Sequence, residues 1–525
     1  MLPEKYLLLW LGACTCCARA AALEIRHLSP FGVVPGHRTV LTFSGSGLGK
    51  ASNLWTSFGA TARRITNSDP DVTAFEVSCP ETATGVGAIQ LFGLDGISNF
   101  ALVLLDPVRA SSGQSEPTEN HSLATAHSIT VPGTADGVAK SELIDYYALE
   151  ARAAETYSIE VIAQRLGSQM DPVVSVLDHA GKELIYCDDE GGIWRDTRFR
   201  FTAPTEGKYI LAVHDVGFGG GNGFSYRLRL THDPLIWFSF PLIDPFEAGV
   251  PVEQLGEGKS NRASASPANP PIATVLSTFP SLAEREPNDR AAEAQSINWP
   301  IMINGKIQRP DDIDFFSFNA GKDEKLVFQS QTRSLGSPCD LVLSLCKSDG
   351  LVIVQSDSSN SSDAALTNKF SEAGRYLLTV RELSGTAAPD VPYRIKVEEF
   401  QPGLEVSSEN NRLQASAGGE VTIKVAATRF DFSGPVTLAL DPTIEGISLE
   451  KGVIPEGKKD GELKLKLSSN MKPGTLFHFR VAARLGINTV TACTVSTAPA
   501  LKKDFPLMPI LPAELDGLFA LGVVE

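Results

Sequence analysis

A chain of 525 residues is too long for a single hydrophobic core and predicts roughly three to five domains. Its hydrophobic content of 42% and charged content of 21% are ordinary for globular proteins and exclude wholesale disorder. The formal net charge of −16 argues against a nucleic-acid binder, and it suits either a solvated extracellular protein or one that collects divalent cations.

Residues 1–22 have the features of an export signal. Lys5 supplies a positive charge, an apolar stretch follows at 6–13, and small residues at 18–22 resemble a cleavage site. The segment before Cys14 (LGAC) also resembles a bacterial lipobox, so Cys14 is either removed with the signal or lipidated as an anchor. No later segment reaches the about 18 apolar residues that a membrane helix needs. We therefore expect an exported protein, extracellular, at the cell surface or periplasmic, with no transmembrane segment in the mature chain.

Five cysteines remain beyond the signal, and they are too scattered for a zinc site or a disulfide-built scaffold. Cys339 and Cys346 lie in one predicted domain. They either pair with each other or remain buried free thiols within strands.

Residues 23–107 are expected to form an immunoglobulin-like sandwich. Short apolar segments alternate with Pro and Gly, starting at 35–36 (PG) and continuing through 42–48 (TFSGSGL) to a turn at 58–59 (FG). This order resembles the first strands of IPT/TIG domains, which implies an immunoglobulin-like fold for the region.

The middle of the chain contains an internal repeat. Residues 145–149 (DYYAL) recur as 314–318 (DFFSF), and residues 207–213 (GKYILAV) recur as 374–380 (GRYLLTV). Two homologous domains are therefore predicted, at 115–232 and 284–399. A polar, Pro-rich linker at 233–283 joins them. Apolar residues alternate with period two in both copies, so each copy is expected to be an antiparallel β-sandwich.

Residues 403–497 have the same alternation and predict another immunoglobulin-like sandwich. A C-terminal tail follows at 498–525 and ends in an apolar run at 518–524. The tail either docks on a domain or indicates a reading frame that is cut short. No segment has the pattern of an amphipathic helix. The predicted fold class is therefore all-β, a multidomain array of immunoglobulin-like and jelly-roll-like sandwiches.

The repeats resemble the bacterial pre-peptidase C-terminal (PPC) domain family. Residues 284–289 (EREPND) match its opening, residues 311–318 (DDIDFFSF) match its D-x-D-[YF]-[YF] strand, and both copies have a G-[RK]-Y-x-[LI]-x-V strand near their end. The resemblance implies a jelly-roll-like sandwich that is appended to secreted peptidases and other exported proteins, often without catalytic activity. Related collagenase domains bind calcium and, in some cases, collagen.

The start of the second repeat also indicates a metal site on physical grounds. Residues at i, i+2 and i+4 of an extended chain face one way, so Glu284, Glu286 and Asn288 present three oxygen ligands together. Ca²⁺ binds about six to eight such oxygens. The alternative is a set of solvated acids at a domain edge. The predicted Ca²⁺ ligands are Glu284, Glu286, Asn288, Asp289, Asp311 and Asp314.

The first repeat predicts a weaker site, because Thr118 and His121 stand where the second repeat has carboxylates. Its predicted ligands are Glu116, Asn120, Glu142 and Asp145. A separate acidic loop at 188–192 (DDEGG) is either a solvated turn or a further cation site.

Nothing in the sequence indicates a reactive centre. The eight histidines are isolated, and neither H-E-x-x-H nor G-x-S-x-G occurs. We therefore expect a non-catalytic protein that binds extracellular protein or polysaccharide, for which a duplicated module would provide avidity. The alternative is the accessory portion of a secreted peptidase or other hydrolase, a spacer or targeting part, whose catalytic part is absent from this chain. The apolar end of the tail favours that alternative.

Overall fold

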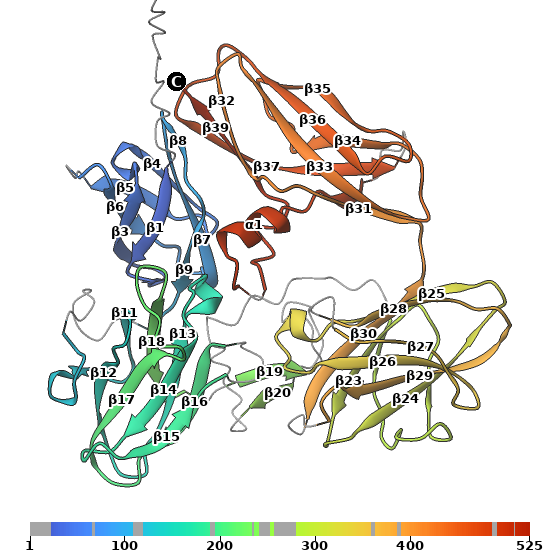
Figure 1. The fold of residues 1–525 in the computed structure, drawn as a ribbon, viewed down its shortest axis with the longest axis horizontal. Coiled ribbons are helices and arrows are strands. Elements are labelled where there is room, and N and C mark those ends of the chain that lie inside the picture. Colours follow the sequence, from blue (N-terminus) through green and yellow to red (C-terminus); the bar gives the residue numbers. More distant parts are fainter. Residues whose placement is uncertain are drawn as a thin grey trace, which may run out of the picture.

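A computed structural model describes residues 23–65, 69–108, 119–189, 195–233, 236–240, 253–256, 280–358, 363–385, 390–485, 491–508 and 510–525. Within these ranges the chain is a multidomain all-β protein, as predicted, with eight β-sheets and one α-helix. Four β-rich bodies follow one another along the chain (Figure 1). The predicted export signal, including Cys14, lies outside the described residues. None of the helices within these ranges is long and apolar enough to cross a membrane.

The N-terminal body is a sandwich of two sheets with the core between them. Exposed residues alternate with buried ones along β3, because one face of its sheet is exposed. The first sheet has the order β1 (Glu24–Ser29), β3 (Arg38–Ser46), β6 (Val72–Ser78) and β5 (Thr61–Ile65). The second has the order β2 (Gly32–Val33), β9 (Ala101–Leu105), β7 (Gly85–Gly93) and β4 (Asn53–Thr56), with β8 (Gly96–Ile97) paired to β7.

The first repeat is also a two-sheet sandwich, with one hydrophobic cluster between its sheets. One sheet has the order β10 (His127–Ser128), β12 (Asp145–Ala151), β17 (Gly207–Asp215), β14 (Pro172–Leu177) and β15 (Glu183–Cys187). The other has the order β11 (Gly133–Val138), β18 (Ser225–Thr231), β13 (Thr156–Ile162) and β16 (Thr197–Thr202).

The second repeat has the same strand order, apart from one additional strand at an edge. Its first sheet has the order β22 (Gln295–Ser296), β24 (Ile313–Ala320), β29 (Gly374–Glu382), β26 (Leu341–Lys347) and β27 (Val352–Ser356). Its second has the order β21 (Ser281–Ala283), β23 (Ile301–Ile307), β30 (Val391–Glu399), β25 (Lys325–Ser330) and β28 (Ala365–Lys369). Between the repeats, β19 (Ile236–Phe240) and β20 (Glu253–Gly256) pair within the stretch that the sequence analysis treats as linker.

The C-terminal body contains a nine-stranded sheet that curves around a core of its own. Its strands are β31 (Gly403–Ser407), β33 (Glu420–Phe430), β36 (Asp460–Leu467), β35 (Ile447–Ile454), β34 (Val436–Asp441), β37 (Thr475–Leu485), β39 (Phe519–Val524) and β32 (Arg412–Ser416), in that order, with β38 (Thr491–Thr494) on β37.

The region after residue 497, which the sequence analysis set apart as a tail, is an integral part of this body. Strand β39 pairs in parallel with β32 and antiparallel with β37, and the apolar run lies in the core. The tail therefore docks on its own domain. The same region contains α1 (Ala498–Asp504), which corrects the expectation of no helix. At seven residues, α1 is too short to show a helical repeat of apolar residues in the sequence.

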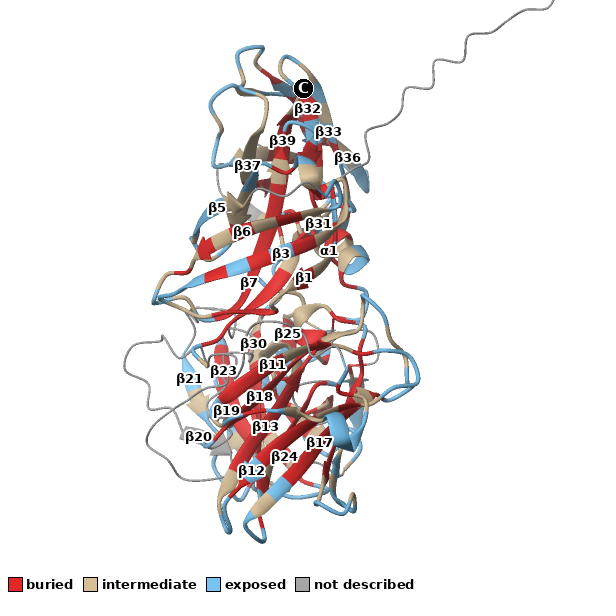
Figure 2. Ribbon diagram, turned by 90° about the vertical axis from the view of Figure 1, so that its left-hand side faces the viewer, coloured by how far each residue is buried: buried red, intermediate tan, exposed pale blue. Residues whose placement is uncertain are grey.

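Helix α1 and the residues after it join three bodies. Leu501, Phe505 and Met508 pack in one buried cluster with Leu102 of β9 and Ile162 of the first repeat. In Figure 1 this helix lies between the N-terminal and C-terminal bodies. Figure 2 shows buried residues concentrated along the strands and exposed ones in the connections.

The cysteines of the described residues are free thiols. Cys339 and Cys346 are both buried in the second repeat and do not pair with each other. Of the two alternatives left open by the sequence, the buried thiols are the one present.

Candidate functional site

A buried tyrosine bonded to an aspartate marks the same position in both repeats. The Tyr393 hydroxyl donates to Asp314 Oδ2 at 2.7 Å, and the Tyr226 hydroxyl donates to Asp145 Oδ2 at 2.6 Å. Each tyrosine lies over a glycine of the neighbouring strand. A Cβ on Gly305 would lie 2.2 Å from the Tyr393 ring, so only glycine fits there. Asp145 begins β12 and Asp314 is the second residue of β24, and in each case the tyrosine occupies one carboxylate oxygen.

In the second repeat, the segment before the sandwich places more oxygens beside Asp314. Carboxylate oxygens of Glu284, Glu286 and Asp314 all lie within 4.8 Å of one another. Asn288 is fully buried between them, and its Nδ2 donates to Glu284 Oε1 at 2.9 Å while its backbone N–H donates to Glu286 Oε2 at 2.8 Å. The free oxygens Asn288 Oδ1 and Asp314 Oδ1 are buried and accept no hydrogen bond from the described residues. Buried oxygens of this kind require a donor or a cation.

A second group of carboxylates adjoins the first through Glu286. Oxygens of Glu286, Asp289 and Asp312 also lie within 4.8 Å of one another. Arg309 partly offsets their charge, because its Nη2 is 2.6 Å from Asp289 Oδ1 and 3.5 Å from Asp312 Oδ1. That guanidinium is 56% exposed, and it contacts Asp289 and Asp312 but neither Glu284 nor Asp314 among the ion pairs of the described residues.

The carboxylates of this cluster resist ionisation. Burial, followed by the hydrogen bond and charge of Glu284, raises the pKa of Asp314 far above its ordinary value. Burial also raises the pKa of Asp312, and burial with the charges of Glu284, Asp289 and Asp312 raises the pKa of Glu286. Carboxylates packed together in this way favour a bound cation, which would reverse the penalty.

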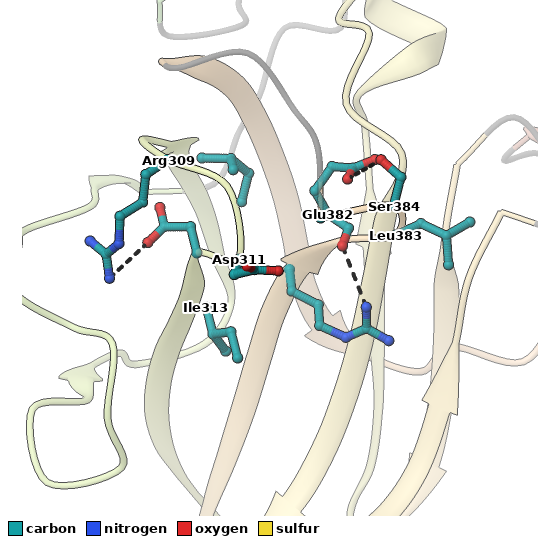
Figure 3. Close-up of a pocket in the computed structure, with 10 residues that line it drawn as sticks. Arg309, Asp311, Ile313, Glu382, Leu383 and Ser384 are labelled. Carbon is teal, nitrogen blue, oxygen red and sulfur yellow. Dashed lines mark hydrogen bonds and ion pairs between the residues drawn. The ribbon is translucent and has the colours of Figure 1, made fainter.

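Asp311 is the one predicted ligand of the second repeat that lies apart from both groups. It has a φ of 61°, and this left-handed turn directs its side chain elsewhere. It lines a small pocket of about 170 Å³, across from Glu382 and Ser384 at the end of β29 (Figure 3). Asp312, which sequence reasoning passed over, takes its place in the cluster. The alternation rule could have found Asp312, since residues two apart in an extended strand share a face with Asp314.

The first repeat has a different charge arrangement at the same place. Asn120 and Asp145 are buried there, but no carboxylate cluster forms among the described residues around them. Instead His121 Nδ1 lies 2.9 Å from Asp145 Oδ1, and Lys140 Nζ lies 3.1 Å from His121 Nε2. Lys140 thus brings a positive charge close to where the second repeat has Asp289, and this charge opposes a bound metal.

The other two predicted ligands of the first repeat do not complete a site either. Glu142 has a φ of 64° and matches Asp311, the ligand that turns away in the second repeat. Leu143 stands at the position of Asp312. Glu116 lies outside the described residues.

No known family model matches the sequence, and no curated protein matches it. Among solved structures, the pre-peptidase C-terminal domain of a collagenase from Bacillus anthracis is 16% identical, over 22% of this chain and 100% of that chain, with a TM-score of 0.18. A protein of a Bacteroides ovatus mixed-linkage glucan utilization locus, solved with a mixed-linkage heptasaccharide, is 11% identical over 71% and 73%, with a TM-score of 0.16. A Eubacterium rectale protein described as secreted is 11% identical over 37% and 70%, with a TM-score of 0.17. Because each TM-score is far below 0.5, none of these similarities identifies the fold or the function of the whole chain.

Proposed function

We propose that this chain is a secreted or cell-surface binding protein, without catalytic activity of its own, whose second repeat is stabilised by Ca²⁺. The observation that carries the proposal is the pair of carboxylate groups that share Glu286. Two buried oxygens beside them, on Asn288 and Asp314, accept no hydrogen bond from the described residues.

The chemistry of the ligand set suits Ca²⁺. It consists only of hard oxygen atoms, which Ca²⁺ prefers, and includes no imidazole or thiolate that would favour zinc. Each group offers three carboxylates, with the Asn288 amide beside the first, and water would complete the about six to eight oxygens that Ca²⁺ binds. The residues that would hold it are Glu284, Glu286, Asn288, Asp289, Asp312 and Asp314.

A cation at this cluster would have a mechanical effect. Glu284 and Glu286 follow β21, which belongs to one sheet of the second repeat. Asp312 directly precedes β24 of the other sheet, and Asp314 is the second residue of that strand. Ca²⁺ would therefore hold the two sheets of the second repeat together at this edge.

The duplication of the sandwich supports binding or adhesion as the role. Two modules on one chain can engage a repetitive extracellular protein or polysaccharide together, which strengthens weak individual contacts. The accessory role in a hydrolase was favoured by the apolar end of the chain. That argument is lost because Phe519, Leu521 and Val523 are buried in the core of the C-terminal body.

The metal proposal is tested with Glu286→Gln, because Glu286 belongs to both carboxylate groups. The glutamine side chain can still accept from the Asn288 N–H, so the fold should survive. In calorimetric melting of the full chain, Ca²⁺ at about 100 times its Kd should stabilise the second repeat by about 2.7 kcal/mol. Glu286→Gln should remove most of this gain, whereas the exposed control Glu293→Gln should keep it. An unchanged melting curve of the wild-type chain in millimolar Ca²⁺ would exclude the site.

The binding proposal is tested by sedimentation of the chain with insoluble collagen, peptidoglycan and acidic polysaccharide, with and without a chelator. Retention of the chain on one of these, without release of soluble fragments, supports a binding protein. Release of fragments by the purified chain would contradict the non-catalytic assignment. Failure to bind any of the three would leave the accessory role as the better account.

A further inference from the structure

A further group of three carboxylates lies in the first repeat, away from the cluster around Glu286. Asp171 directly precedes β14, and Asp188 and Asp189 directly follow β15, its neighbour in the sheet. Carboxylate oxygens of these three residues all lie within 4.8 Å of one another. The pairing of β14 with β15 therefore brings Asp188 and Asp189 of the acidic loop together with Asp171. Residues 190–192 of that loop lie outside the described residues.

Two oxygens of this group are buried and unsatisfied. Asp171 is 8% exposed, and its Oδ2 pairs with Arg195 Nη1 at 2.6 Å. Its other oxygen, Oδ1, is buried and accepts no hydrogen bond from the described residues, and the same holds for Asp188 Oδ1. A buried carboxylate oxygen without a partner carries a desolvation cost that a ligand would relieve.

The second repeat shows how the fold satisfies this position without a ligand. The register of the strand pair is the same in both copies, with Val174 opposite Cys187 and Leu343 opposite Ser356. Asp171 therefore matches Asp340, and Asp189 matches Ser358. The Ser358 hydroxyl donates to Asp340 Oδ1, and Arg333 pairs with Asp340 Oδ2 at 3.2 Å. In the first repeat Asp189 replaces this hydroxyl donor with a carboxylate, so Asp171 Oδ1 accepts no hydrogen bond from the described residues.

The three carboxylates of this group repel one another electrostatically. Burial and the carboxylates of Asp189 and Asp188 raise the pKa of Asp171, although Arg195 acts in the opposite direction. Burial and the Asp188 carboxylate likewise raise the pKa of Asp189. Arg195 pairs with Oδ2 of Asp171, and Oδ1 has no hydrogen-bond partner among the described residues.

We propose that Asp171, Asp188 and Asp189 bind a divalent cation in the first repeat, with Ca²⁺ the ion that suits an all-oxygen site in an exported protein. Three carboxylates supply the protein ligands, and water completes the coordination shell. The site is independent of the cluster around Glu286, since it lies in the other repeat and uses none of the same residues. Its effect is to fasten the end of the edge strand β15 to the start of β14.

The test is titration calorimetry of the full chain with Ca²⁺ in the Glu286→Gln background, which silences the second repeat. We expect one remaining equivalent of bound Ca²⁺, and its loss on adding Asp189→Ser. That variant copies Ser358 and should fold, because the serine can donate to Asp171 Oδ1. The exposed control Glu150→Gln, on β12 of the same repeat, should keep the equivalent.

Each outcome of this titration decides between the two sites. Binding that persists unchanged with Asp189→Ser would overturn the proposal, as would the absence of any binding in the Glu286→Gln background. Conversely, loss of all Ca²⁺ binding with Asp189→Ser alone, without Glu286→Gln, would refute the Glu286 cluster and support the site at Asp171, Asp188 and Asp189.

Terbium luminescence provides a second measurement, which also reports where in the chain the ion binds. The Tyr186 hydroxyl lies 3.5 Å from Asp188 Oδ2, close enough for the ring to sensitise Tb³⁺ bound to the group. In the Glu286→Gln background, Tb³⁺ emission excited through tyrosine should fall to background with Asp189→Ser and should be competed by Ca²⁺. The reciprocal change Ser358→Asp recreates the three carboxylates in the second repeat and should add one equivalent of bound Ca²⁺. If Ser358→Asp adds none, three carboxylates in this frame do not suffice and the proposal fails.

Discussion

Single residues decide how each repeat handles the same buried aspartate. Asp314 and Asp145 each accept a hydrogen bond from a buried tyrosine hydroxyl through one carboxylate oxygen. The other oxygen of each aspartate faces the neighbouring side chains. In the second repeat those neighbours are carboxylates, whereas in the first His121 lies 2.9 Å from the aspartate. One fold therefore carries two electrostatic arrangements. In the first repeat Lys140 lies beside His121 at this position, whereas in the second repeat carboxylates surround the aspartate.

His478 provides a prediction of pH dependence at this scale. Its ring stacks on Trp55 of the N-terminal body with centroids 4.1 Å apart, and Nε2 lies 2.9 Å from Gln90 Oε1. Burial lowers the pKa of His478 to about 4. In the unfolded chain the imidazole binds a proton near pH 6.5. The unfolded state therefore takes up a proton first as the pH falls, and the folded state loses stability between about pH 6.5 and pH 4.

The expected effect is on the order of 2 kcal/mol between pH 7 and pH 5, from about 1.4 kcal/mol per unit of pKa difference. Denaturant unfolding at both pH values should show this loss in the wild-type chain. His478→Gln, which retains a donor toward Gln90 but cannot titrate, should show a smaller loss. The exposed control His179→Gln should behave as the wild type does. Equal pH dependence in His478→Gln and in the wild type would contradict the assignment.

Strand β39 shows how an element remote in sequence completes a domain. It enters between β32 and β37, and its Phe519 ring stacks on Phe479 of β37 with centroids 5.7 Å apart. Without β39, the backbone groups of two neighbouring strands and one side of the core would face water. The last residues of the chain are therefore part of the hydrophobic core of the C-terminal body.

Phe519→Ala tests the contribution of this strand. Phe519 is fully buried, so removing its ring should destabilise the C-terminal body by about 3 to 5 kcal/mol, through lost burial and the cavity left behind. Chemical denaturation monitored by a probe in this body measures the change. Leu507→Ala, at a side chain that is 53% exposed, should alter the stability by less than about 0.5 kcal/mol. A small effect of Phe519→Ala would mean that β39 is dispensable.

For the molecule as a whole, buried ion pairs hold the N-terminal body to the first repeat. Asp106 follows β9 and is fully buried. Its oxygens lie 3.6 Å from Arg227 Nε and 3.4 Å from Arg229 Nε, both on β18 of the first repeat. Arg227 also pairs with Asp136 at 2.6 Å. Because these charges are removed from water, they are stable only while the two bodies remain in contact.

Asp106→Ala should therefore weaken this junction. It leaves two buried guanidinium groups short of a partner, which costs about 3 to 5 kcal/mol in comparable buried pairs. In calorimetry, we expect the unfolding of the N-terminal body to separate from that of the first repeat. The control Asp95→Ala breaks only a surface pair with Lys50 and should change stability by less than about 1 kcal/mol. Retained joint unfolding in Asp106→Ala would show that apolar contacts alone hold the junction.

The sequence by itself determined the features that depend on local spacing. Period-two alternation and closely spaced turn residues predict β-strands, since both describe the geometry of an extended chain over a few residues. The duplication is visible because two copies of one segment keep their order. The side chains of Glu284, Glu286 and Asn288 do approach one another. The segment forms no strand and bends at Glu286, however, so their approach does not come from regular alternation along an extended chain.

Tertiary structure decided the features that join distant parts of the chain. Contacts between separated segments bring His121 against Asp145 and Lys140 against His121. The insertion of β39 beside β32 and the meeting of Asp171 with Asp188 depend on strand pairing between separated segments. Such pairings are set by which buried surfaces fit together, and no local pattern of residues contains that information.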